Sequence, residues 1–260
     1  MTESDRLHEL CRLRSTLEAF AVRRWPGGSA RSELEEALRQ RLARLKQLAA
    51  AGDYEAFHAA DREFHRVAVD AVGLAALSRS WELIVLEVDA WILAAKRSYW
   101  PNLMALYREH ELLLEAWRGT DGDGAELATH QHLEAGWHRR MMAEESADGK
   151  LDAVERAVSF IATHYARPLT VAWLASKVSF VSPSQLRRLF HQRLRVSPLQ
   201  HLKQVRLERA AQLLCSGADE VAVVARRSGY RNVSHFGRDF RRMHGVTPLA
   251  YRRRGGRAPD

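Results

Sequence analysis

The chain has little cysteine, and its two cysteines, Cys11 and Cys215, lie in different halves of the sequence. This usage argues against a disulfide framework, so we expect both thiols to pack as small apolar groups in a reducing compartment. An apolar run of the roughly 20 residues that a membrane span needs is also lacking. Acidic residues interrupt the most apolar stretch, Trp81–Ala95. Because no signal-peptide pattern opens the sequence either, we expect a cytoplasmic protein that does not bind membranes.

Several motifs of enzymes are missing as well. The sequence has no glycine-rich phosphate loop and no nucleophile motif. Strand signals are nearly absent, whereas apolar residues recur at helical spacing throughout. A chain of 260 residues should hold about two domains that each bury a core. We therefore expect an all-α protein with domains at 1–148 and 149–260, joined by the polar linker Glu144–Gly149.

The charges are divided unequally between these two parts. Residues 150–260 carry 21 Lys and Arg against 7 Asp and Glu, a net charge of +14. The first 149 residues carry 19 against 25, a net charge of −6. Basic charge confined to one domain is typical of a protein that binds the phosphates of a nucleic acid.

Glycine and proline divide the first part into helices. Pro26 and the glycines after it end the first helix, and the residue before Pro101 ends the fourth. The other expected helices span 29–51, 54–71, 102–118 and 125–144, with a turn at 119–124. Short connections between helices of this length predict an antiparallel helical bundle.

A unit of about thirty residues occurs twice in the basic part, at an offset of fifty positions. Identical residues recur at this offset: Ala172 and Ala222, Ala175 and Ala225, Ser184 and Ser234, Arg188 and Arg238, Phe190 and Phe240. Each copy predicts a short helix, a turn and a second helix with an apolar seam and a basic face. Such a helix-turn-helix places its second helix in a major groove of DNA. A long connecting helix at 199–215 separates the two copies, and Thr170 is expected to cap the helix that opens the first.

These residues resemble the DNA-binding domain of AraC/XylS transcription regulators. The resemblance covers about 152–254 and includes Ser182–Phe190, Val196–Pro198, Gly229–Tyr230 and Gly245–Pro248. Two departures are Arg195, where that family usually has glycine, and the run Lys177–Val181, which lacks the usual small residue.

The resemblance implies recognition helices at about 183–193 and 233–243. Side chains expected to face bases are Ser184, Gln185, Arg187, Arg188, Val233, Ser234, His235 and Arg238. Arginine pairs with guanine, glutamine with adenine, and valine contacts the methyl group of thymine. Lys203, Arg241 and Arg242 are expected on phosphates, which position the protein without reading sequence.

Four residues of the first part form a candidate metal site. Asp61 and His65 lie four residues apart and therefore share one face of the third helix. His110 and His132 lie midway along the fifth and sixth helices, which can bring them to the same point. One carboxylate with three imidazoles suits zinc, nickel, manganese or iron. On spacing alone, ordinary surface or core histidines remain the alternative.

The first part also resembles the FCD effector domain of GntR-type regulators. The features that carry this resemblance, over about 5–145, are Leu10–Glu18, Asp61 with His65, Glu109–Leu113, and Ala128 with His132. The resemblance implies that Asp61, His65, His110 and His132 bind a divalent metal, with zinc or nickel favoured over manganese or iron. It also implies a small organic-acid effector that completes the coordination, and a homodimer formed through this domain. Leu17, Trp81, Ile84 and Trp91 are candidates for the dimer surface or for the core.

Together these patterns predict a DNA-binding transcription regulator, not an enzyme, with double-stranded DNA and a carboxylate effector as partners. The alternatives are a metal-dependent enzyme, or an inert helical bundle, fused to a DNA-binding domain. A sensor returns its organic acid unchanged, an enzyme converts it, and an inert bundle gives no response to it.

Overall fold

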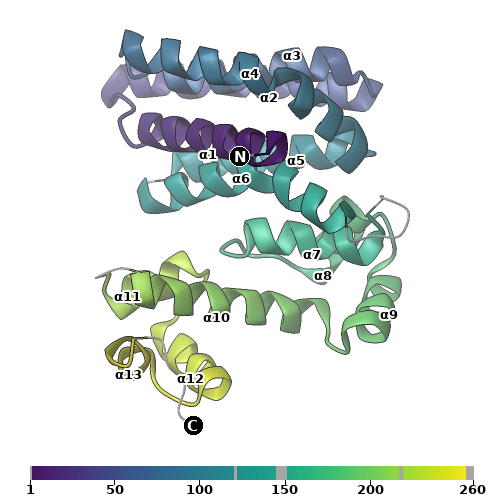
Figure 1. Cartoon of the computed structure of the whole chain (residues 1–260), viewed down its shortest axis with the longest axis vertical. Coiled ribbons are helices and arrows are strands. Elements are labelled where there is room, and N and C mark those ends of the chain that lie inside the picture. The colour runs from purple at the N-terminus through teal and green to yellow at the C-terminus, as the bar shows by residue number, and fades with distance from the viewer. Residues whose placement is uncertain (1, 120–121, 145–150, 217–218, 256–260) are drawn as a thin grey trace. The chain divides into compact units, whose positions relative to one another are not determined.

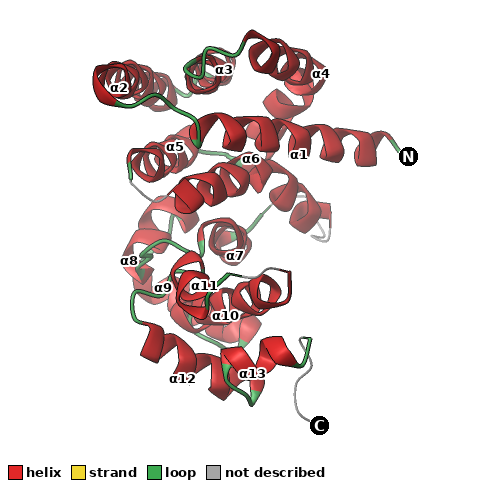
Figure 2. Cartoon of the chain, turned by 90° about the vertical axis from the view of Figure 1, so that its left-hand side faces the viewer, coloured by secondary structure: helices red, strands yellow, loops and turns green. Residues whose placement is uncertain are grey.

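The computed structural model describes residues 2–119, 122–144, 151–216 and 219–255, and within these ranges it contains helices and no strands (Figures 1 and 2). The chain forms two compact units, Met1–Leu151 and Asp152–Asp260. The expected boundary after residue 148 and most of the expected linker, residues 145–149, lie outside the described residues. None of the described helices is long and apolar enough to cross a membrane.

The first unit is a bundle of antiparallel helices. Their bounds are α1 Glu3–Val22, α2 Gly28–Ala51, α3 Tyr54–Asp70, α4 Ala75–Tyr99, α5 Leu103–Arg118 and α6 Gly122–Glu144. Both views place α2, α3 and α4 in one layer and α1, α5 and α6 in the other (Figures 1 and 2). Residues of α3 therefore face α5 and α6 across the middle of the bundle.

Local capping explains where most of these helices begin. The side chains of Thr2, Asp53 and Asn102 each accept a hydrogen bond from a backbone N–H in the first turn of α1, α3 and α5. The sequence predicted a turn at 119–124, but α6 already begins at Gly122, so the predicted end of the turn is wrong. Asp123 lies in the first turn of α6, where a carboxylate is favourable, and it accepts a hydrogen bond from Arg23.

The core of the bundle consists of aliphatic and aromatic side chains from all the layers. Phe57, Phe64 and Trp117 are almost completely buried at its centre. The sequence did not decide whether Trp81 and Ile84 belong to the core or to a dimer surface. Both are buried inside the unit, so they belong to the core. The large apolar side chains that stay exposed on α1 and α4 are instead Leu13, Phe20, Leu83 and Leu86.

The second unit is built around a single long helix. Its elements are α7 Ala153–His164, α8 Val171–Trp173, the π-helix η1 Leu174–Ser179, α9 Pro183–Leu194, α10 Pro198–Ser216, α11 Val221–Arg227, α12 Val233–His244 and α13 Pro248–Arg253. Helix α10 has 19 residues and is therefore about 28 Å long. Helices α7 and α9 of the first helix-turn-helix unit contact α10, as do α11, α12 and α13 of the second, so both units pack against this one helix.

The two recognition helices start at the residues that the repeat predicts, 183 and 233, but the turns before them differ. In the second copy, Gly229 has φ +82° and ends the first helix of the motif. In the first copy, Thr170 caps the helix as expected, and its last six residues form η1, so the left-handed residue is Phe180, with φ +55°. The wider π turn takes up one extra residue, which keeps α9 and α12 in register.

Arg195 ends α9 in the conformation that glycine usually provides. Its φ is +58°, and its repeat counterpart Gly245 has φ +77°. The arginine therefore leaves the turn intact, at the cost of a left-handed backbone that a side chain disfavours by roughly 1–2 kcal/mol. Gly229 is constrained more strongly, because a Cβ there would lie 2.7 Å from the backbone oxygen of Ala166.

Substitutions at these two positions should change the stability of the second unit in opposite directions. Arg195→Gly should stabilise the second unit by about 0.5–1 kcal/mol, since relief of the backbone strain exceeds the added entropy of the unfolded chain. Gly229→Ala should destabilise it by at least about 2 kcal/mol, because the methyl group meets backbone that cannot move aside. Calorimetric unfolding of the full chain measures both, and equal signs would contradict the assignment.

Candidate metal centre and nucleic-acid interface

The four predicted ligands meet at one point inside the first unit. Asp61 and His65 come from α3, His110 from α5 and His132 from α6, and all four side chains are buried. One ligand atom of each lies within 4.8 Å of the others. The i, i+4 spacing on α3 and the facing positions on α5 and α6 thus produce the convergence that the sequence suggested.

Which ring nitrogen of His110 carries the hydrogen decides whether a cation fits this cluster. Its Nδ1–H donates to the backbone oxygen of Leu106 at 2.9 Å, and because that oxygen can only accept, the neutral ring has its lone pair on Nε2. Nε2 lies 2.5 Å from Asp61 Oδ1 without the geometry of a hydrogen bond. Two electron-rich atoms therefore face each other in a buried space, an arrangement that a shared metal ion satisfies.

His65 is held in the orientation that a metal ligand needs. Its Nδ1–H donates to Glu18 Oε2 at 2.7 Å, which leaves Nε2 directed toward the cluster, 3.8 Å from Asp61 Oδ1. Glu18 lies on α1 and also accepts hydrogen bonds from Arg14 Nε and Trp81 Nε1, both at 2.8 Å. Burial raises the pKa of Glu18, but the neighbouring His65 and Arg14, with the hydrogen bonds from His65 and Trp81, outweigh burial and lower this pKa to about 2. A carboxylate that orients a ligand histidine is a usual outer partner in metal sites.

Lys96 on α4 also contacts the cluster. Its Nζ donates to Asp61 Oδ2 at 2.7 Å and lies 2.9 Å from His58 Nδ1. Burial alone raises the pKa of Asp61, yet the positive charge and hydrogen bond of Lys96, together with the neighbouring imidazoles, lower it well below the usual range. His58 Nε2 lies 3.0 Å from Asp89 Oδ1, so the polar chain continues to a partly exposed carboxylate.

Sequence reasoning missed Glu18, Arg14 and Lys96. The pair Arg14 and Glu18 has the i, i+4 spacing of a helical ion pair, which is a signal that was present. Lys96 offered none, because a lysine in the last turn of a helix ordinarily interacts with the helix dipole and solvent.

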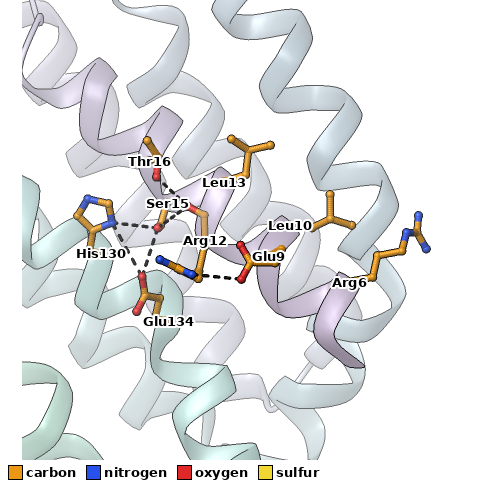
Figure 3. A pocket seen from close by; sticks show the side chains of 9 residues that line it. All are labelled: Arg6, Glu9, Leu10, Arg12, Leu13, Ser15, Thr16, His130 and Glu134. Carbon is orange, nitrogen blue, oxygen red and sulfur yellow. Dashed lines mark hydrogen bonds and ion pairs between the residues drawn. The ribbon is translucent and has the colours of Figure 1, made fainter. Parts of the chain in front are cut away.

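Two cavities border α1 in this unit. A small one of about 50 Å³ lies beside the ligand cluster and is lined in part by Arg14, Lys96, Trp91 and Trp100. A larger one of about 660 Å³ lies between α1 and α6, where Ser15 Oγ is 2.9 Å from His130 Nδ1 (Figure 3). His130 thus lies at the larger cavity and not among the four clustered side chains.

In the second unit, arginines fall into two groups. One group is bound to the protein itself: Arg206 donates to the backbone oxygens of Tyr165 and Arg167, and Arg193 pairs with Asp152 and Glu155. The other group has no hydrogen bond or ion pair among the described residues and lies exposed on α9 and α12: Arg187, Arg188, Arg238, Arg241 and Arg242. The unpaired group is thus available to a nucleic acid.

The remaining predicted DNA contacts are also at the surface. Ser184 and Gln185 on α9 are exposed, as are Val233, Ser234 and His235 on α12. Lys203 is exposed on α10, but its Nζ pairs with Asp239 Oδ1 at 3.0 Å. A phosphate would have to compete with that carboxylate for Lys203.

Comparison with known proteins agrees with both halves of this description. Residues 9–135 match the model of the FCD domain, and residues 175–254 match that of a helix-turn-helix domain. The chain carries an FCD domain at its N-terminus and an AraC-type helix-turn-helix domain in its C-terminal region. The resemblances seen in the sequence are confirmed.

Several curated relatives of the AraC-type domain are transcription regulators. The chain is 32% identical over 93 residues to the probable transcriptional regulator LumQ of Photobacterium leiognathi, covering 36% of this chain and 37% of that protein. It is 29% identical over 185 residues to the arabinose operon regulatory protein of Escherichia coli, covering 62% and 63%. A solved structure of a probable AraC family transcriptional regulator from Rhodopseudomonas palustris is 30% identical, with a TM-score of 0.37 over 40% of this chain and 96% of that one. The chain thus spans less than two thirds of the curated relatives.

The AraC-type domain keeps its turns despite the two departures from the family pattern. Arg195 adopts the left-handed conformation of the missing glycine, and η1 replaces the small residue expected within Lys177–Val181. The FCD domain likewise contains its four expected ligands in one cluster.

Proposed function

We propose that this chain is a sequence-specific, DNA-binding transcription regulator whose DNA affinity is modulated by a small organic acid bound at a metal centre in the FCD domain. The observation that carries the proposal is the buried His110 Nε2, which faces Asp61 Oδ1 within a cluster of four possible ligands. In the same chain, exposed arginines on the two recognition helices have no hydrogen bond or ion pair to any described residue.

The donor set favours a borderline divalent ion. Three imidazole nitrogens and one carboxylate oxygen suit zinc or nickel first, with manganese or iron as further options. A bound ion would supply a positive centre that attracts a carboxylate. Four protein ligands leave coordination positions for a small ligand in a five- or six-coordinate ion, as a responsive site requires.

The charges around the cluster support an anionic effector. Asp61 and Glu18 are balanced by Lys96 and Arg14, so the buried side chains are close to neutral as a group. A divalent ion adds two positive charges, and an uncompensated buried charge is costly. A carboxylate ligand reduces that cost.

Arg14 provides a second recognition group for the carboxylate. Its Nε is occupied by Glu18, whereas neither terminal nitrogen has a hydrogen bond to any described residue. The side chain is buried and lines the small cavity. Arginine binds carboxylates through two parallel N–H groups, so Arg14 and the ion together can orient one carboxylate.

The position of the site supports coupling to the DNA-binding domain. Its residues belong to α1, α3, α4, α5 and α6, and α6 is the last helix before the second unit in the chain. An effector changes DNA affinity only through its different affinities for two conformations. A ligand bound where five helices meet can create such a difference.

Removal of one ligand tests the metal centre. His110→Ala should lower metal affinity by at least about 100-fold and abolish the response of DNA binding to organic acids, while DNA binding without acid persists. Metal content by mass spectrometry after dialysis, with DNA titrations, measures these effects. His110→Asn, which keeps more of the volume, covers the case in which the alanine variant unfolds.

The matched control is His130→Ala, which removes a histidine of α6 at the other cavity. This variant should keep both the metal and the response. Parent protein without stoichiometric metal, or a His110→Asn variant that still responds fully, would overturn the metal centre.

Substitution on the recognition helices tests DNA reading. Arg188→Ala or Arg238→Ala should weaken binding to a site selected from random DNA by about 1–3 kcal/mol and relax preference at one base pair. Arg39→Ala, an exposed arginine of the first unit, is the control that should change neither. Equal losses on selected and random DNA would show that these arginines bind phosphates only.

Exposed apolar side chains on the FCD domain support a homodimer. Leu13 and Phe20 on α1 are 48% and 37% exposed, and Leu83 and Leu86 on α4 are 67% and 56% exposed. The two helices pack against each other, and Arg6 of α1 pairs with Glu87 of α4 on this side. Exposed large apolar side chains on two packed helices are typical of an interaction surface.

A charged substitution tests this surface. Leu83→Glu combined with Leu86→Glu should convert a dimer into a monomer at micromolar concentration, since burial of two carboxylates in an interface is costly. Sedimentation of the full chain measures the change, with Leu199→Glu in the second unit as the control. A monomeric parent protein at that concentration would refute the dimer.

A further inference from the structure

The small cavity beside the ligand cluster has two chemically different ends. Arg14 and Lys96 line it on the side of Asp61, His65 and His132. The other lining residues are apolar: Cys11, Trp91, Ile92, Ala95, Trp100, Leu106, Leu133 and Gly136. A ligand that enters therefore meets cations with one end and apolar side chains with the other.

Trp100 forms a fixed wall of the apolar end. Its indole N–H donates to Glu109 Oε1 at 3.0 Å, and its ring is buried. The guanidinium of Arg139 lies 4.0 Å from the ring centre and also pairs with Glu109. These contacts occupy the one polar atom of the ring, so Trp100 presents only its apolar surface.

Gly136 on α6 leaves a narrow space between two tryptophan rings. A Cβ at this position would lie 3.6 Å from the ring of Trp100 and 3.7 Å from that of Trp91. Both values are ordinary van der Waals distances, so the space above Gly136 has the width of about one methyl group. Glycine inside a helix is unfavourable relative to alanine, and here its absence of a side chain keeps this space open.

The volume limits the size of the ligand. The cavity has about 50 Å³, against roughly 30 Å³ for one water in the liquid and roughly 150 Å³ for a cavity that holds benzene. An aromatic or branched acid would therefore have to extend out of this space past the partly exposed Trp91. A second carboxylate would lie against apolar side chains with no partner, which is costly.

We infer that the effector of the FCD domain is a monocarboxylate of two or three carbons, with Gly136, Trp91 and Trp100 as the residues that set its length. The inference rests on the proposed function and specifies the ligand of the same site. The carboxylate lies toward the metal ligands, Arg14 and Lys96. The short tail lies above Gly136 between the two rings.

The test is calorimetric titration of the metal-loaded full-length protein with acetate, propionate, butyrate and benzoate, with chloride as the ionic control. Acetate and propionate should bind, butyrate should bind at least about tenfold more weakly than propionate, and benzoate should not bind, since a pocket discriminates one methylene by about 10- to 200-fold.

Two variants change the space in opposite directions. Gly136→Ala adds one methyl group and should weaken propionate by about 10- to 100-fold and acetate less. Its metal content should stay unchanged and its unfolding temperature should not fall, because alanine is the better helix former. Trp91→Ala, which enlarges the cavity at its partly exposed wall, should strengthen butyrate and admit benzoate.

The outcomes separate this inference from the proposed function. Parent protein that binds butyrate or benzoate as tightly as propionate, or a Gly136→Ala variant with unchanged affinities, overturns the size limit and leaves an acid-responsive regulator standing. Metal-loaded protein that binds none of the short acids but does bind a larger or dicarboxylic acid also overturns only the size limit. Protein that binds no organic acid overturns the effector role itself.

Discussion

The buried carboxylate of Asp61 is the constraint on which the FCD domain depends. It lies among three imidazoles and the ammonium of Lys96, in a core where an isolated charge is unfavourable. Every group around it is in turn fixed by another: His65 by Glu18, Glu18 by Arg14 and Trp81, His110 by the backbone of α5. The polar network therefore ties together helices that the apolar core only brings into proximity.

Lys96 gives this network a stable arrangement that does not require an ion. Its ammonium lies 2.7 Å from Asp61 Oδ2, whereas His110 Nε2 faces the other oxygen, Oδ1. The two carboxylate oxygens thus have different partners: Oδ2 forms the ion pair with Lys96, and Oδ1 faces the imidazoles. In the proposed metal centre, Oδ1 would serve as the ligand atom beside the imidazoles, while Oδ2 keeps its contact with Lys96.

The sequence allowed the helical bundle and the duplicated helix-turn-helix to be predicted, because helical periodicity, caps and breakers are local signals. Asp61 and His65 follow from i, i+4 spacing, but His110 and His132 needed the resemblance to the FCD family, since nothing local places α5 and α6 opposite α3. Lys96 could not be assigned, because its partners His58 and Asp61 lie on another helix and only packing joins them. Arg14 and Glu18 had a local signal, their i, i+4 spacing on α1, which was overlooked. The start of α6 was missed for a related reason: Asp123 is stabilised by Arg23, a hundred positions away.

The AraC-type domain shows a second way in which local rules are overridden. Phe180 and Arg195 occupy left-handed conformations that glycine adopts at little cost, yet α9 begins and ends where its repeat partner α12 does. The apolar seam explains this: Leu186 and Phe190 are completely buried, as are Phe236 and Phe240. Burial of two large side chains is worth roughly 3–6 kcal/mol in the first copy, which offsets the strain of its two left-handed residues, roughly 1–2 kcal/mol each. Packing therefore sets the orientation of the recognition helices, and the backbone at their ends adapts to it.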